Sequence, residues 1–168
     1  MPAPRAHPPS APPPRPAEGA FRQLLRTMGL VERVMHPYFA RFGITGAQWG
    51  VLRNLHRAEL EDQRALRLTD LSDRLLIRPP SVTTVVDRLE RAKLVTRGGL
   101  ATDLRAKQVA LTPRGRQLVE RVLAVHGAQI GAVMGALTPA EQAELQGLLR
   151  RLEVHLAGLL AAGPVDDL

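Results

Sequence analysis

The sequence predicts a mainly α-helical protein with a small β element, which is an α+β fold class. Most of the chain repeats apolar residues at three- and four-residue spacing, as amphipathic helices require. The period falls to two in the segments Leu94–Arg97 and Lys107–Leu111, which predicts two strands joined by a loop that Gly98 and Gly99 open. Aromatic residues make up only 3% of the 168 residues, so leucine, valine and alanine must form the core.

The N-terminal part divides into an arm and a helix. Residues 1–17 are rich in proline and cannot bury a core, so we expect a disordered arm. Residues 18–44 follow with helical spacing, and Pro37 predicts a bend or break near His36. The apolar face of this helix is larger than a small domain can cover, so we expect it to serve in dimerisation.

Residues 45–111 are expected to form a compact central domain. Thr45 is a candidate N-cap for a helix that ends near His56, and residues 57–67 form a charged connection. Thr69 is expected to cap a short helix, Asp70–Leu76, with its leucines, Leu76 included, turned inward.

The next helix begins in the segment Arg78-Pro79-Pro80-Ser81 and runs to about Ala92. Proline is favoured there because the first N–H groups of a helix have no intrahelical partner. Its apolar stripe is Val82, Val85, Val86 and Leu89. Short helices, a longer third helix and a two-stranded ribbon, in this order, predict a winged helix-turn-helix domain.

Residues 112–162 predict two C-terminal helices that also serve in dimerisation, followed by a tail, 163–168. Each helix begins with a threonine before a proline, at Thr112 and at Thr138, which is a typical helix start. The segment Val122–Ala140 has no charged residue but is too polar for a membrane span, and we interpret it as a buried helix. Gly127, Gly131 and Gly135 share one face of that segment. Close backbone approach at a dimer interface best explains them, and a flexible cavity wall comes second.

The basic residues are concentrated in one region. Between Arg78 and Arg116 lie nine basic and three acidic residues, an excess of six out of a formal net charge of +7. Charged runs are commonly only solvated faces, but this one coincides with the third helix and the ribbon. We therefore expect it to contact the phosphates of duplex DNA.

The third helix carries the candidate base contacts. Ser81, Thr84, Arg88 and Arg91 fall at i, i+3, i+7 and i+10, on the face opposite the valines. Of these, Arg91 is better placed, like Lys93, for contacts with the DNA backbone. A helix of this kind fits the major groove, where arginine can bind guanine through two hydrogen bonds. The predicted DNA-binding residues are Arg78, Ser81, Thr83, Thr84, Asp87, Arg88, Arg91, Lys93, Asp103, Arg105 and Lys107.

The loop of the ribbon carries a carboxylate two residues before an arginine. Asp103 can hold the guanidinium of Arg105 in one orientation, and at a wing tip that arginine would enter the narrow minor groove. The alternative is an ordinary surface ion pair, worth at most about 1 kcal/mol.

These motifs together resemble the MarR family of bacterial transcription regulators. The segments that carry the resemblance are Gln48-Trp49-Gly50-Val51-Leu52, Leu68-Thr69-Asp70-Leu71-Ser72, Val82 to Arg91, Leu94-Val95, Asp103-Leu104-Arg105 and Leu111-Thr112-Pro113-Arg114-Gly115. The resemblance implies a winged-helix homodimer whose first and last two helices interlock. It also implies repression at pseudo-palindromic DNA and release by a small aromatic or lipophilic effector, with Trp49, His36 and Phe39 as candidate effector contacts.

The sequence departs from the family in several places. Arg78 stands where a serine is common before the first proline of the recognition helix, which removes a cap and adds a positive charge. Gly50 occupies the position at which a urate-binding branch carries an acid, which disfavours urate. The chain has no cysteine, so it is not one of the family's thiol peroxide sensors.

Other function classes have weaker support. No nucleophile, phosphate-binding loop or metal-ligand spacing stands out, so we expect neither an enzyme nor a cofactor nor a metal. A metal site formed by His36, His56 and His126 across a dimer is a minor alternative. A protein-interaction module and a non-specific architectural DNA binder remain as rival functions. No secretory signal is visible, and we expect a cytoplasmic protein without a membrane partner.

Overall fold

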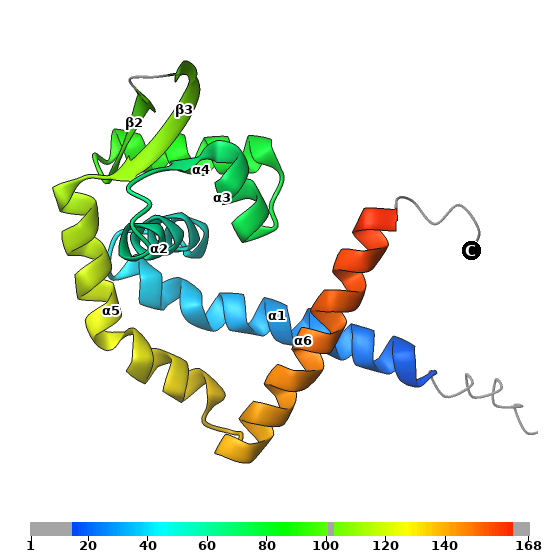
Figure 1. Ribbon diagram of the computed structural model, residues 1–168. Coiled ribbons are helices and arrows are strands. Elements are labelled where there is room, and N and C mark those ends of the chain that lie inside the picture. The colour runs from blue at the N-terminus through cyan, green and yellow to red at the C-terminus, as the bar shows by residue number, and fades with distance from the viewer. Residues whose placement is uncertain (1–14, 101–102, 163–168) are drawn as a thin grey trace, which may run out of the picture. The chain divides into compact units, whose positions relative to one another are not determined.

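The computed structural model describes residues 15–100 and 103–162, and the side chains of these residues except those of residues 99–107. The chain divides into two compact units, one up to Gly46 and one from Ala47 onward. The described elements, in chain order, are α1 (Pro16–Ala40), α2 (Gly46–Leu60), β1 (Leu66–Arg67), α3 (Leu68–Leu75), α4 (Pro79–Arg91), β2 (Val95–Leu100), β3 (Asp103–Leu111), α5 (Pro113–Met134) and α6 (Pro139–Ala162) (Figure 1). Residues 1–14 of the predicted arm lie outside the described residues. The predicted tail, 163–168, lies outside them entirely.

Helix α1 is continuous, so the predicted break near His36 is wrong. Pro37 lies inside the helix, one turn before its end at Ala40. Proline has a φ angle that suits a helix, and so close to the C-terminus the hydrogen bond that it removes is one of the last. Gly43, with φ +71°, follows the helix. Near this end Tyr38 packs edge-on against Phe39 and Phe42, with ring centroids 5.0 and 5.5 Å away.

The connection after α2 contains a strand that the sequence analysis missed. Helix α2 runs to Leu60, a turn beyond the predicted end, and β1 places Leu66 opposite Val109 of β3. Both of these side chains are buried. Residues 57–67 are therefore partly helix and partly sheet, because β3 supplies the hydrogen-bonding partner for β1.

Helix α3 begins and ends differently from the prediction. It starts at Leu68, and the carboxylate of Asp70 accepts a 2.9 Å hydrogen bond from the backbone N–H of Arg67. Thr69 is thus not the cap. Leu76 takes the left-handed conformation that ends the helix, with φ 52°, and its side chain is 80% exposed. The expectation that Leu76 turns inward is wrong because this backbone change points it away from the core.

Helix α4 confirms the prediction closely. Val82, Val86 and Leu89 are fully buried, and the helix ends one residue before the expected position. Lys93, in the left-handed region with φ 59°, donates its N–H to Glu90, and Leu94 donates to the carbonyl of Leu89. These two bonds satisfy the last carbonyls of the helix.

The sheet is antiparallel, in the order β1-β3-β2. The strands are longer than predicted, because Gly98 pairs with Gln108 and Gly99 with Lys107. The two glycines therefore belong to β2 rather than opening a loop, and the register shift comes after Gly99. The pairing of the backbones, which needs no side chain, extends the strands through these glycines.

The predicted starts of α5 and α6 are confirmed. The Thr112 hydroxyl accepts from the N–H of Gly115 at 3.0 Å. At α6 the N–H of Thr138 donates to the carboxylate of Glu141 at 2.7 Å, and the N–H of Glu141 donates back to the Thr138 hydroxyl at 3.3 Å. This reciprocal arrangement is a capping box.

The prediction that the uncharged segment 122–140 is one buried helix is wrong. It spans the end of α5, a turn and the start of α6. Within it Leu123, Val125 and Ile130 are 36%, 44% and 41% exposed. No single helix in the described ranges is long and apolar enough to cross a membrane, although α5 and α6 together, bent by 92°, pass that test of length and composition.

Candidate nucleic-acid interface

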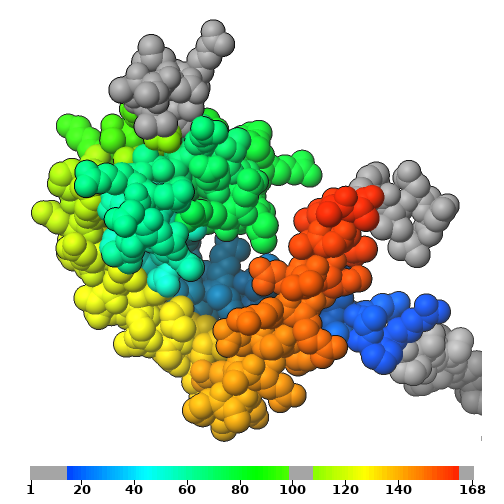
Figure 2. Space-filling model, in the orientation of Figure 1, coloured from blue at the N-terminus to red at the C-terminus, as the bar shows by residue number. Residues whose placement is uncertain are grey.

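Helix α4 presents a polar face to solvent. The side chains of Ser81, Thr84, Arg88 and Arg91 are all exposed. On the other side of the helix Val82 and Val86 are buried and Val85 is half-buried. The helix and the β2–β3 hairpin lie next to one another at the same end of the second unit (Figure 1), and Figure 2 shows the described part of this end, in green, in space-filling form. The 3.6-residue period therefore predicted this face correctly. Whether it contacts bases stays a prediction.

The two threonines of α4 already use their hydroxyl protons. Thr83 donates to the carbonyl of Pro79 and Thr84 to that of Pro80, each at 3.1 Å. In this rotamer each hydroxyl oxygen can only accept a further hydrogen bond. Amino groups on base edges, such as those of adenine and cytosine in the major groove, are suitable donors.

One basic residue entered the sequence analysis only as part of the positive charge. Arg97 of β2 reaches α4, where its Nη1 lies 2.6 Å from Oδ1 of Asp87 and 3.1 Å from Oε2 of Glu90. Asp87, predicted to contact bases, is thus already engaged by an arginine of the wing. The signal that could have revealed this is the i, i+3 spacing of the two acids just before a strand that carries an arginine.

A second basic residue of the same region is also engaged within the chain. Arg116 binds Glu59 through two nitrogens, at 2.8 to 3.1 Å. The hydrogen bonds to Glu59 raise the pKa of Arg116 above its ordinary value, and the charge of Glu59 adds to this. Arg97 and Arg116 therefore account for part of the basic excess without being free for a ligand.

The other predicted phosphate contacts are accessible where they are described. Arg78, Arg91 and Lys93 are exposed around the two ends of α4. The side chains of Asp103, Arg105 and Lys107 lie outside the described residues, although their backbone belongs to β3. Their roles stay predictions.

The candidate effector residue Trp49 packs beside a histidine and an arginine. Its side chain is buried, the ring of His126 stands edge-on at a centroid distance of 5.2 Å, and Cζ of Arg53 lies 5.9 Å from the Trp49 ring. Burial, and then the charge of Arg53, lower the pKa of His126. His126 is therefore neutral near pH 7.

The other predicted effector residues belong to the first unit. On α1 Phe39 is buried and His36 is exposed. No group of three or more His, Cys, Asp or Glu side chains within the described ranges could hold a metal ion.

The chain is similar in sequence to bacterial transcription regulators. Residues 42–106 match the model of the MarR family. The chain is 26% identical over 133 residues to the HTH-type transcriptional regulator PecS of Dickeya dadantii, and the match covers 79% of each protein. An uncharacterised HTH-type transcriptional regulator of Bacillus subtilis, YkoM, is 31% identical over 94 residues, which are 56% of this chain and 61% of YkoM.

Solved structures share the fold. A mutant of MarR from E. coli complexed with operator DNA superposes with a TM-score of 0.71 at 25% identity, covering 78% of this chain and 91% of MarR. BpsR of Bordetella bronchiseptica, whose DNA binding is regulated by 6-hydroxynicotinic acid, gives 0.70 at 29% identity, covering 80% and 98%. AbsC of Streptomyces coelicolor gives 0.74 at 25% identity, covering 84% and 94%. The predicted fold class is confirmed, and the chain is similar in fold and over residues 42–106 to the MarR family of winged helix-turn-helix, DNA-binding transcriptional regulators.

Proposed function

We propose that this chain acts in the cytoplasm as a homodimer that represses transcription by binding a pseudo-palindromic operator, and that a small aromatic or lipophilic effector releases it. The observation that carries the proposal is the exposed face of α4, with two hydroxyls near its start and Arg88 at its centre. The central region, 45–111, binds DNA in this proposal, and regions 18–44 and 112–162 form the dimer.

The DNA contacts divide into three groups. Ser81, Thr83, Thr84, Asp87 and Arg88 read bases in the major groove. Arg78, Arg91, Lys93 and Lys107 bind phosphates, which gives affinity without sequence preference. Arg105, oriented by Asp103, enters the minor groove.

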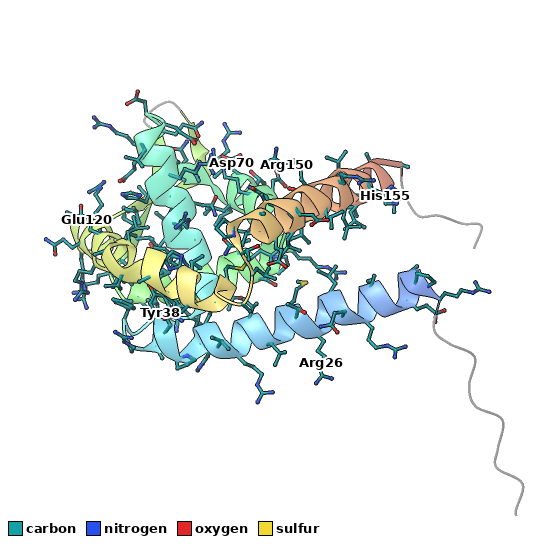
Figure 3. All side chains as sticks on the ribbon, turned by 90° about the horizontal axis from the view of Figure 1, so that it is seen from below. Arg26, Tyr38, Asp70, Glu120, Arg150 and His155 are labelled. Carbon is teal, nitrogen blue, oxygen red and sulfur yellow. The ribbon has the colours of Figure 1, made fainter. Side chains whose placement is uncertain are left out.

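The dimer is supported by apolar surface that the single chain leaves exposed. Phe21 and Met28 of α1 are 62% and 60% exposed, and none of the 24 residues of α6 is buried. Figure 3 shows side chains projecting along the whole of α6, Arg150 and His155 among them. A Cβ added at Gly127 or Gly131 would meet no atom within 4 Å. A second copy of the chain would bury this surface.

We expect the full chain to sediment at twice its mass of 18.3 kDa. Leu152→Glu, on the leucine stripe of α6, should raise the dimer dissociation constant by roughly a hundredfold, because each copy then buries an unpaired charge. Val154→Glu, on the other side of α6, is the matched control and should leave the mass unchanged. A monomeric unaltered chain at micromolar concentration would exclude the proposed dimer.

For the wing, we expect Arg105→Ala to weaken DNA binding and to reduce the salt slope by about one phosphate equivalent. For Asp103→Ala, the two possible roles of the carboxylate predict changes in DNA affinity of opposite sign. Loss of the orienting carboxylate predicts weaker binding, whereas loss of a repulsive charge predicts tighter binding. Titrations at several salt concentrations decide between them, and tighter binding at every concentration would remove the orienting role.

For the effector, we expect aromatic acids, 6-hydroxynicotinic acid among them, to quench or shift the fluorescence of Trp49 and to lower DNA affinity. Arg53 beside the ring can bind the carboxylate, so Arg53→Met should weaken such binding about tenfold. Arg57→Met, whose arginine pairs with Glu61 directly after the same helix, is the matched control. A panel of phenols and aromatic acids that changes neither signal would contradict the proposal. The roles of His36 and Phe39 stay predictions.

A non-specific architectural DNA binder and a protein-interaction module are the rivals. Selection of preferred sequences from random duplex DNA by the full chain separates them. The proposal predicts enrichment of one pseudo-palindromic sequence. Binding without enrichment indicates an architectural protein, and no binding indicates an interaction module.

A further inference from the structure

We propose that Arg97 is a positioning residue that fixes the wing relative to α4, so that the sequence preference of the protein depends on a side chain that does not itself contact DNA. The inference rests on the proposed function, in which α4 and the wing bind adjacent grooves. Arg97 joins the two elements by ion pairs rather than by apolar packing alone.

The guanidinium of Arg97 bridges two carboxylates of α4. One nitrogen, Nη1, contacts both Asp87 and Glu90, at 2.6 and 3.1 Å. Nη2 points at the carbonyl of Thr83 at a longer 3.5 Å. The backbone of Arg97 pairs with Val109 of β3. A single residue thus connects both strands of the wing to three successive turns of the helix.

The surroundings of Arg97 indicate that stability alone does not account for it. Its side chain is only 22% exposed. Its Nε is buried and has no hydrogen-bond partner among the described atoms. An unsatisfied buried N–H costs free energy, and an apolar side chain at this place would avoid that cost. What an apolar side chain could not do is hold two carboxylates in fixed positions.

The position of the bridge explains why it would affect sequence preference. Asp87 directly precedes Arg88 on α4, and the tip of the wing follows Arg97 after a few residues. Specific binding requires the contacts in the major groove and those of the wing at a fixed separation. Non-specific binding depends mainly on phosphates and tolerates a change in that separation. Loosening the bridge should therefore lower specific binding more than non-specific binding.

Arg97→Lys tests this with the charge conserved. Lysine can contact a carboxylate as a point charge but does not have the planar fork that bridges two of them. The full chain first selects a preferred duplex from random sequences, and affinities are then measured for that duplex and for a scrambled one. We expect Arg97→Lys to lower the ratio of the two affinities by at least about tenfold, similar to one mismatched base pair. The affinity for the scrambled duplex and the salt slope should stay unchanged.

Arg91 supplies the matched control. It is exposed near the end of the same helix and is proposed to bind phosphate. Arg91→Met should weaken both duplexes about equally and reduce the salt slope by about one. Arg97→Met strands two carboxylates near DNA, so it should weaken both duplexes and also lower the ratio, without the loss in slope.

The outcomes are distinguishable. If the unaltered chain enriches no sequence, the proposed function fails and the inference falls with it. If it enriches a sequence and Arg97→Lys keeps the full ratio, the inference alone is overturned. A reduced salt slope in Arg97→Met would also overturn it, because Arg97 would then be a phosphate contact. Circular dichroism melting of each variant tests whether it is folded. If Arg97→Met does not fold, the result for the charge-conserving Arg97→Lys decides the question.

Discussion

Gly115→Ala is expected to lower the free energy of unfolding by about 3 kcal/mol or more, which is the largest loss of stability that we expect from a single substitution here. Gly115 lies in the first turn of α5, where the helix passes close to the backbone of Leu94, just after α4. A Cβ there would overlap the carbonyl oxygen of Leu94 and would lie 3.3 Å from Cδ2 of Leu111. The obstacle is backbone, so no side-chain rotation relieves it.

The same position also carries a hydrogen bond that any displacement would break. The N–H of Gly115 donates to the Thr112 hydroxyl, and that hydroxyl lies 2.8 Å from the carbonyl of Lys93. Moving α5 away from Leu94 would therefore disturb the cap and its link to the end of α4. Thermal unfolding should show a fall in melting temperature of roughly 10 °C.

Gly19→Ala is the matched control for Gly115→Ala. Gly19 lies near the start of α1, which also begins with a proline, and a Cβ there meets no atom within 4 Å. Alanine should stabilise that helix by up to about 1 kcal/mol. Equal melting temperatures for Gly115→Ala and the unaltered chain would show that α5 does not pack against Leu94 as described.

Arg88→Ala has the largest effect expected on function. Arg88 is exposed at the centre of the α4 face, where a guanidinium can bind both acceptors of a guanine. The change should cost about 1–3 kcal/mol on the selected duplex and relax the preference at one base pair. Affinity for scrambled DNA should fall much less.

Lys93→Ala is the comparison that separates affinity from preference. Lys93 lies beyond the end of α4, with a left-handed backbone, and alanine keeps the Cβ and thus the backbone strain unchanged. Its loss should weaken selected and scrambled duplexes about equally and reduce the salt slope by about one. Equal losses on both duplexes for Arg88→Ala would instead place Arg88 among the phosphate contacts.

The sequence predicted what local chemistry determines. The buried face of α4 followed from a 3.6-residue period, and the starts of α5 and α6 followed from Thr112 and Thr138 before prolines. These features depend on residues within one or two turns, and the structure confirms them. The exposed face proposed to bind DNA is the complement of the buried one, so it was predictable for the same reason.

The sequence did not predict what distant partners determine. Strand β1 has two residues and exists because β3, about forty positions later, pairs with it. The outward turn of Leu76 depends on how α3 ends, and the bridge from Arg97 to α4 depends on how a strand packs against a helix. Neither has a periodic signal. Pro37 shows the opposite error, in which a strong local rule was applied too near a helix end for its cost to break the helix.

The most direct test of the account is the affinity of the full chain for its selected duplex and for a scrambled duplex of the same composition, measured together at one salt concentration. We expect two chains bound per selected duplex and a preference of about a thousandfold or more. Equal affinity for the two duplexes would contradict sequence-specific binding by α4 and the wing.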